Sequence, residues 1–289
     1  MHLTLLGTGC PQVDPDRFGP AALVRTNDAT ILMDVGSGVT QRLASAGIKG
    51  ADLDLVLLTH LHSDHVIDLY QLIVSSWHQG RERPQRILGP PGTRGFVDAT
   101  MALWREEREL RIAHERRPST TALTVEVEEI EDGWSCTRGG TTLRAVQVDH
   151  QPIPYALGFV VEQANRKLAI SGDTRYCPAL IEAARGADLL LHECFVHAEM
   201  QPVPGVRSAD TVAAVAGYHT LSSEVGKVAA EAGVSALALT HFVQTRFDQD
   251  ALLAEVRTDF AGPILVGEDL MTVDVAARSV RYREGVIGY

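Results

Sequence analysis

The sequence predicts an α/β fold in which several strands end, at one edge of a sheet, in polar side chains. Short apolar runs at 55–58, 168–170, 188–191 and 236–239 have the length and composition of buried strands. Segments with helical spacing of apolar residues separate these runs. Each run stops in histidine, aspartate or glutamate, which are costly to bury without a partner.

The first of these runs leads into the segment 59–65, whose sequence is THLHSDH. His60 and His62 occupy alternate positions of an extended segment, so both imidazoles can point the same way. Asp64 and His65 follow on the turn into the next helix. One loop would then serve two metal ions, the first pair on one ion and the second pair on the other. Four potential ligands within six residues favour a metal site over a polar turn that happens to hold three histidines.

The length of 289 residues allows one large α/β domain or two small ones, and 45% hydrophobic with 22% charged residues is ordinary for a folded protein. No short repeat, low-complexity tract or linker interrupts the chain, so we expect a single domain over 1–289. The Thr-His pairs at 59–60 and 240–241 hint at two related halves.

Composition restricts the compartment and the partners. No apolar run approaches membrane-spanning length, and the amino terminus lacks the basic start and long apolar core of a signal peptide. We therefore expect a cytoplasmic protein with no membrane partner. The four cysteines are scattered, which argues against a disulfide framework or a thiolate zinc site. The formal net charge of −11 counts against a large nucleic-acid footprint without excluding a local one.

The first half of the chain alternates predicted strands and helices. Gly7-Thr8-Gly9 after the first strand lacks the spacing of a dinucleotide-binding loop and is interpreted as a tight turn. Asp34 ends the third strand beside glycines and is either a hydrogen-bond partner of a metal-binding histidine or a structural turn residue. From their apolar spacing we expect strands at 2–6, 22–25, 30–33, 87–89, 123–130 and 141–148, and helices at 39–47, 66–77 and 93–108.

The predicted strand at 141–148 and three predicted strands in the second half end in polar residues. The carboxyl ends of strands in one sheet build a site along one edge of the layer, and a matching set is hard to ascribe to chance. These ends carry Asp149 and His150, Ser171 to Asp173, His192 and Glu193, and Thr240 and His241.

His219 precedes a predicted helix that runs to Gly233, for which Thr220 or Ser222 is the expected cap. A helix amino terminus favours anions, so His219 is a candidate phosphate contact, with a plain helix-entry residue as the alternative. The segment 194–217 is rich in Pro, Gly and Val and is interpreted as a loop, with a substrate-binding lid near the site as the hypothesis for its role.

These motifs resemble those of the metallo-β-lactamase-fold hydrolases and, within them, the ribonuclease Z group. The resemblance implies a four-layer αββα sandwich, with two mixed β-sheets flanked by helices. The matching residues are 6–11 (LGTGCP), 59–65 (THLHSDH), 89–93 (GPPGT), His150, 171–174 (SGDT), His192, Glu193, His219 and 240–242 (THF).

The resemblance also implies two divalent metal ions, with zinc favoured and manganese or iron possible. Two ions about 3.5–4 Å apart would hold a shared hydroxide that attacks phosphorus or a carbonyl carbon, with Asp64 as the candidate general base. His219 would protonate the leaving oxygen or steady the phosphate, and His192 and Glu193 would either orient it or simply close the strand. The implied ligands are His60, His62 and His150 for the first ion, Asp64, His65 and His241 for the second, and Asp173 as a bridge.

One departure from the family concerns the substrate. Ribonuclease Z proteins that trim transfer RNA precursors carry a glycine- and proline-rich arm that grips the RNA, in bacterial members between the positions that match His150 and Asp173. Here only 151–172 intervene, enough for two strands and a turn, so we expect no arm there. RNA would then have to be bound by local basic patches such as 81–86 or 105–117.

Three functions are compatible with the sequence. A ribonuclease Z-like phosphodiesterase, acting as an endonuclease on RNA ends or on a smaller phosphodiester, is favoured by His219 and the GPPGT turn. A hydrolase of small esters, lactones or carbamates is favoured by the missing arm and the negative net charge. A degenerate metal-binding scaffold is disfavoured because every ligand position holds a competent residue. The resemblance also implies a homodimer.

Overall fold

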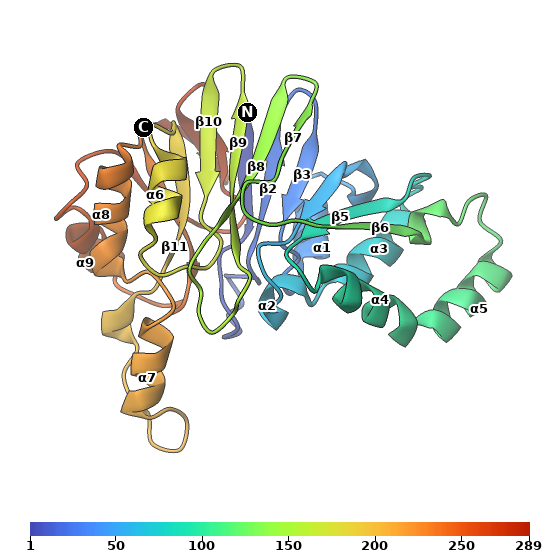
Figure 1. The fold of residues 1–289 in the computed structure, drawn as a ribbon, viewed down its shortest axis with the longest axis horizontal. Coiled ribbons are helices and arrows are strands. Elements are labelled where there is room, and N and C mark those ends of the chain that lie inside the picture. The colour runs from blue at the N-terminus through green and yellow to red at the C-terminus, as the bar shows by residue number, and fades with distance from the viewer.

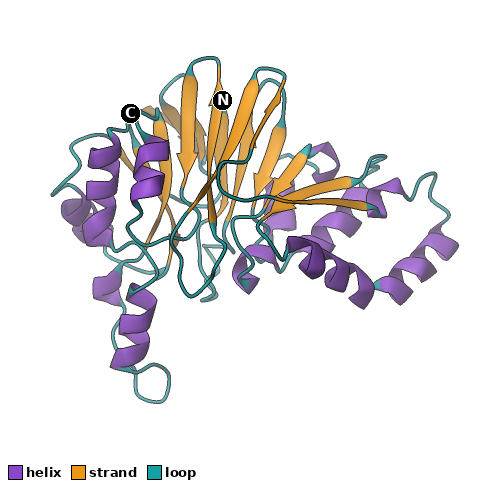
Figure 2. Cartoon of the chain, viewed as in Figure 1, coloured by secondary structure: helices purple, strands orange, loops and turns teal.

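The computed structural model describes residues 1–289 and consists of two β-sheets packed face to face, with helices on both outer surfaces (Figures 1 and 2). The nine-stranded sheet has the order β16-β15-β14-β1-β2-β3-β4-β5-β6. Its strands β3 to β6 run parallel and the others pair antiparallel, so the sheet is mixed. The strands are β1 (His2–Gly7), β2 (Ala21–Arg25), β3 (Thr30–Met33), β4 (Leu55–Leu57), β5 (Gln85–Gly89), β6 (Val125–Glu129), β14 (Thr272–Asp274), β15 (Ser279–Tyr282) and β16 (Gly285–Gly288).

The seven-stranded sheet has the order β13-β12-β11-β10-β9-β8-β7. It is also mixed, because β10 to β13 are parallel and β7 to β10 are antiparallel. The strands are β7 (Ser135–Arg138), β8 (Thr141–Gln147), β9 (Leu157–Gln163), β10 (Arg166–Ile170), β11 (Leu189–Cys194), β12 (Leu237–Phe242) and β13 (Ile264–Val266).

Helices cover the outer face of each sheet, which completes the predicted αββα sandwich. One layer comprises α1 (Val39–Ser45), α2 (Ser63–Val66), α3 (Leu69–His78), α4 (Thr93–Leu103) and α5 (Arg105–Glu115). The other comprises α6 (Pro178–Ala184), α8 (Ser222–Ala232) and α9 (Gln249–Val256), while α7 (Ala209–Ala216) projects away from the sandwich (Figure 1). Three short 3₁₀ turns lie at Gly50–Asp52, Thr121–Leu123 and His197–Glu199. None of the helices has the length and apolar character needed to cross a membrane.

The main core lies between the two sheets. It is built by side chains that point alternately to the inner and outer face along each strand. In β9, Phe159 and Val161 point into the inter-sheet core, while Val160 points outward against α6, α8 and α9. In β1, Leu5 points inward and Leu6 outward. Because both faces of the central strands are covered, these strands read as continuous apolar runs in the sequence.

Two predicted helices are interrupted. The helix expected at 66–77 is instead α2 and α3, because Asp68 at the break binds the backbone of α1: its Oδ2 atom accepts from the Thr40 N–H at 2.7 Å. The helix expected at 93–108 ends at Leu103. There Trp104 leaves helical geometry and its ring stacks on Tyr70, with 5.0 Å between ring centroids. Both breaks depend on contacts with distant elements, so local spacing does not reveal them.

We expect Leu168→Ala to lower the free energy of unfolding by about 2–5 kcal/mol, because the Leu168 side chain is fully buried between the sheets and the change leaves a cavity. The matched control is Leu110→Ala on α5, whose side chain is 71% exposed, with an expected change under about 0.5 kcal/mol. Urea unfolding followed by circular dichroism measures both. Equal losses for the two variants would contradict the assignment of the core.

Candidate metal centre

The residues predicted to bind metal converge at the carboxyl ends of strands from both sheets. β4 leads into His60 and His62, and α2 carries Asp64 and His65. Of the other three, His150 follows β8, Asp173 follows β10 and His241 lies in β12. Five of the seven are buried, whereas His62 and Asp64 are partly exposed and form the open side of the site.

The side chains form two groups. His60, His62, His150 and Asp173 place ligand atoms within 4.8 Å of one another, and so do Asp64, His65 and His241. Within the first group, the His62 Nδ1 atom lies 2.9 Å from His60 Nε2 and 3.2 Å from His150 Nε2. This is the division into two groups that the sequence predicts, although the binding of metal by each residue stays a prediction.

A single oxygen of Asp173 contacts both groups. Its Oδ2 atom lies 3.2 Å from His241 Nε2 and 3.3 Å from His65 Nε2. The same oxygen lies 3.8 Å from His60 Nε2 and 3.8 Å from His150 Nε2. A carboxylate that bridges two ions has to occupy a position of this kind.

The residues fit divalent metal ions. The Nε2 atom of His65 and both ring nitrogens of His241 are buried without a hydrogen-bond partner. Unpaired buried nitrogens are costly, and coordination to a metal would satisfy one on each ring. Imidazole nitrogens combined with a few carboxylate oxygens are the donor set that zinc, manganese and iron accept.

The electrostatics of the site follow from burial and close charges. Burial lowers the pKa of His60 well below its usual value and that of His150 to about 4, so both rings are neutral and keep a free lone pair. Burial opposes the charged form of Asp173, but His241 and His65 hold its pKa well below the usual range. Burial also opposes the charged form of His65, yet the carboxylates of Asp173 and Asp34 raise its pKa well above the usual value.

Asp34 connects residues of both groups. Its Oδ2 atom accepts hydrogen bonds from the His65 Nδ1–H and the Thr59 hydroxyl, both at 2.8 Å, and its Oδ1 atom accepts from the Thr59 N–H. The Thr59 hydroxyl also lies 3.0 Å from His60 Nδ1. Because this hydroxyl donates its proton to Asp34, it accepts from His60 Nδ1–H, which leaves His60 Nε2 free to bind metal. Thr59 was not among the predicted site residues, and its position directly before His60 was the available signal.

Glu193 holds His219 beside the two groups. The His219 Nδ1–H lies 2.9 and 3.0 Å from the two Glu193 carboxylate oxygens, and the Thr174 N–H donates to the same carboxylate at 2.7 Å. The ligand atoms of His219, Asp173 and His241 also lie within 4.8 Å of one another. Of the two alternatives for Glu193, the structure therefore shows contact with His219. His192 donates to the Glu193 carbonyl instead, and no hydrogen bond joins it to His219.

The predicted cap of α8 was wrong. The residue at the cap position is Leu221, while the Thr220 hydroxyl donates to the Thr174 carbonyl at 2.6 Å and the Ser222 hydroxyl lies 3.2 Å from His197 Nδ1. His219 is thus oriented by a carboxylate.

The segment 194–217, predicted to be a loop, includes the helix α7. The next residue, Tyr218, contacts the site: its carbonyl accepts a hydrogen bond from His150 Nδ1–H at 2.8 Å.

Comparison with known proteins agrees with this geometry. Residues 1–204 match the family model of the anti-Pycsar protein Apyc1. The chain is 38% identical over 283 residues to ribonuclease Z of Mycobacterium marinum, covering 96% of this chain and 100% of that protein. The chain belongs to the Apyc1 and ribonuclease Z families. The predicted resemblance to ribonuclease Z is therefore confirmed, and with it the class of metal-dependent hydrolases.

Solved structures share the fold of this ribonuclease Z family member. The short form of human tRNase Z superposes with a TM-score of 0.71 at 23% identity and covers 95% of this chain and 99% of that chain. The metallo-β-lactamase-fold protein YhfI of Bacillus subtilis gives a TM-score of 0.70 at 21% identity, covering 94% and 99% of the two chains. These likenesses confirm the predicted metallo-β-lactamase fold.

In this member of the ribonuclease Z family, we expect Thr59→Val to weaken zinc binding by about 10–100-fold, because His60 and Asp34 lose the hydroxyl that joins them. Competition between the metal-free protein and a chromophoric chelator measures the affinity. Thr59→Ser keeps the hydroxyl and serves as the matched control. Unchanged affinity in a normally folded Thr59→Val variant would contradict the orienting role.

Proposed function

We propose that the protein is a metal-dependent phosphodiesterase with chemistry of the ribonuclease Z type. The observation that carries this proposal is the Asp173 oxygen shared by two groups of ligands, with the His219–Glu193 pair beside it. The relatives named ribonuclease Z support it, as does the human tRNase Z structure. The proposed substrate class is a phosphodiester, either at an RNA end or in a smaller molecule.

Seven side chains would hold the two divalent ions. When bound, such ions polarise a phosphoryl oxygen and lower the pKa of bound water, which supplies the nucleophile at neutral pH. We assign Asp64 as general base because it is partly exposed and its Oδ2 atom lies 3.4 Å from His241 Nε2, at the open side of the site. The proposed ligands are His60, His62 and His150, then Asp64, His65 and His241, with Asp173 as the bridge.

His219 is the proposed proton donor. Its Nδ1–H is taken by Glu193, so Nε2 is the nitrogen that remains for a substrate. In the imidazolium form, with Nε2 protonated as well as Nδ1, it would donate the Nε2 proton to the leaving oxygen, or a hydrogen bond to the phosphate. The Glu193 carboxylate fixes the ring orientation and the tautomer, as a carboxylate does for many catalytic histidines.

The missing arm and the pairing of basic side chains on the surface indicate the size of the substrate. β9 and β10 account for most of the chain between His150 and Asp173 and form a hairpin, so no arm is inserted there. The projecting segment 195–218, which includes α7, contains one arginine and two acidic residues, Glu199 and Asp210. On α5, Arg111 is paired with glutamates. Without an unpaired basic arm, phosphate contacts to a folded RNA would be few, which favours a small phosphodiester or a short RNA end.

Further assignments rest on weaker support. We propose zinc as the resident metal from the donor set. We propose one domain over 1–289, because the largest core cluster takes side chains from both sheets. We propose a cytoplasmic location, since all four cysteines are free thiols. A homodimer is proposed from the likeness to ribonuclease Z alone.

We expect zinc- or manganese-loaded protein to hydrolyse bis(p-nitrophenyl) phosphate, and Asp64→Ala to reduce kcat by at least about 100-fold because the proposed base is lost. A transfer RNA precursor with a 3′ trailer, assayed in parallel on a gel, tests for RNA cleavage. Removal of the trailer would identify RNA as a substrate. Turnover of esters or lactones but of neither phosphodiester would contradict the proposal and favour a small-molecule hydrolase.

We expect His219→Ala to reduce cleavage of phosphodiesters with a sugar leaving group by about 10²–10⁴-fold, but cleavage of p-nitrophenyl esters far less, because p-nitrophenolate leaves without a proton. Glu193→Gln should also reduce cleavage of the substrates with a sugar leaving group more than cleavage of the p-nitrophenyl esters. The difference should be smaller than for His219→Ala. Initial rates on paired substrates measure this. Equal losses on both kinds of substrate would assign His219 to phosphate binding instead of proton donation.

A further inference from the structure

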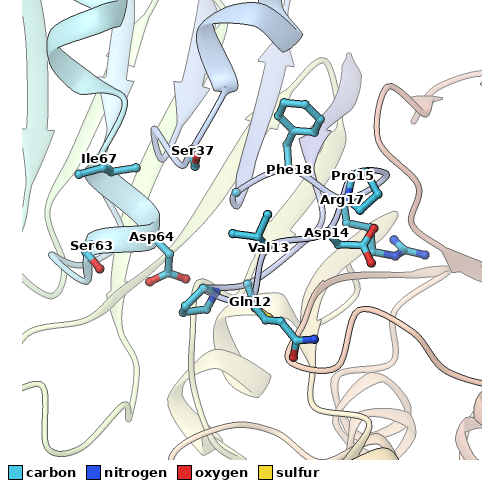
Figure 3. Close-up of a pocket in the computed structure, with 13 residues that line it drawn as sticks. Gln12, Val13, Asp14, Pro15, Arg17, Phe18, Ser37, Ser63, Asp64 and Ile67 are labelled. Carbon is cyan, nitrogen blue, oxygen red and sulfur yellow. The ribbon is translucent and has the colours of Figure 1, made fainter.

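The cavity beside Asp64, which Val13 and its loop line, adjoins the metal centre (Figure 3). A second pocket, of about 170 Å³, lies away from the centre and is lined by residues of β1, β2, β14 and β15 and by the end of α1. β2 begins at Ala21, which lines the same small cavity as Asp173, and ends at Arg25 in the second pocket. The four residues of strand between these positions span about 13 Å. A ligand in the second pocket would not contact the metal centre.

Strand register places the polar side chains of this pocket on one face of the nine-stranded sheet. Thr4 pairs with Leu23 on β2 and with Thr272 on β14, and Thr272 pairs with Arg281 on β15. Directly opposed residues of antiparallel strands project from the same face. Leu23 packs under the outer helices, so all of these side chains project to the outer face. Arg25 projects with them, because it lies two residues after Leu23 in the same strand.

Three arginines line the pocket, and none of them has a partner in the protein. They are Arg25, Arg281 and Arg283, and none forms a salt bridge or a side-chain hydrogen bond. The Nε atom of Arg25 is buried, so solvent does not satisfy it either. An unpaired buried donor costs free energy, and an oxygen atom of a ligand would remove that cost. This atom distinguishes the pocket from a cluster of fully solvated surface arginines.

The acceptors next to the pocket are already used by other groups. The Oδ1 atom of Asp274 accepts from the N–H groups of 276–277, both at 3.0 Å. Its Oδ2 atom lies 3.8 Å from His2 Nδ1. At the end of α1, the carbonyls of 42–44 accept from the N–H groups of 46–48. The protein therefore leaves the positive charge of the pocket without a matching negative charge.

A pair of hydroxyls adds a further donor. The Thr4 and Thr272 hydroxyl oxygens lie 2.9 Å apart, and both residues line the pocket. One of these hydroxyls donates to the other, so one proton of the pair remains for a ligand. Guanidinium groups donate and cannot accept, and their planar shape suits the oxygens of phosphate. The volume is below the range of about 300–1,000 Å³ for drug-sized molecules, so the occupant is a small anion with several acceptor oxygens.

We propose that this pocket is a binding site for a phosphate dianion, either free or as the end group of a small phosphate monoester. Arg25, Arg281 and Arg283 hold the phosphate oxygens. The remaining hydroxyl proton of the Thr4–Thr272 pair adds a hydrogen bond. Three positive charges favour a dianion over a monovalent carboxylate. The site is separate from the metal centre, so it does not depend on the proposed phosphodiesterase function.

Isothermal titration calorimetry of the zinc-loaded protein with inorganic phosphate tests the site. The metal centre also attracts phosphate, so the proposed site is measured as the binding event that the arginine variants weaken. Arg25→Gln and Arg281→Gln should each weaken this event by about tenfold or more, because each removes a charged hydrogen-bond donor. Arg281 is exposed, so its replacement leaves the core intact. Arg278→Gln, at an exposed arginine in the turn before β15 and outside the pocket, removes the same charge and should keep the wild-type affinity.

Titration with methyl phosphate distinguishes the two sources of the anion. An arginine-dependent event with methyl phosphate identifies monoesters as ligands, and one with inorganic phosphate alone identifies the free ion. Identical phosphate binding by the wild-type protein and both pocket variants would overturn the proposal. So would an equal loss in Arg278→Gln, which would show an effect of net charge, or equally tight binding of acetate, which would exclude selection for a dianion. Circular dichroism and zinc content establish that each variant is folded and loaded equally.

Discussion

The structure depends on one buried carboxylate, that of Asp173, whose Oδ2 atom lies within 3.8 Å of nitrogens from several imidazoles. A buried charge of this kind is tolerated only where partners surround it. Here the partners come from β4, α2, β8 and β12, so elements of both sheets must end at the same edge. The face-to-face packing of the sheets, with its shared apolar core, makes that possible.

A further layer of contacts fixes the orientation of the rings. His65 and His60 are joined through Asp34 and Thr59, His219 is held by Glu193, and His150 donates to a backbone carbonyl. In each case one ring nitrogen is used by the protein and the other is left to face the centre of the site. The orientations of these rings are therefore set by contacts within the protein.

The surroundings of the centre support the proposal of a small phosphodiester substrate. The net charge of −11, the hairpin in place of an inserted arm and the pairing of Arg111 on α5 with glutamates provide little for a long polyanion. A cavity of about 470 Å³ opens beside Asp64, by contrast, with a volume that suits a small molecule. These features support the proposed small phosphodiester over a folded RNA as the substrate.

The sequence by itself determined most strands at the centre of the two sheets, the polar strand ends and the candidate ligands, but it did not reveal β7 or β13 to β16. Buried strands appear as unbroken apolar runs, and the ligands at 60–65 are close together in the chain. Only the tertiary structure decided how residues from His60 to His241 meet at Asp173, how Thr59 joins Asp34, and that Leu221 occupies the N-cap position of α8. It also decided the helix breaks at Asp68 and Trp104, and the cavity under Val13. Each of these depends on contacts between segments far apart in the chain, which local composition and spacing do not encode.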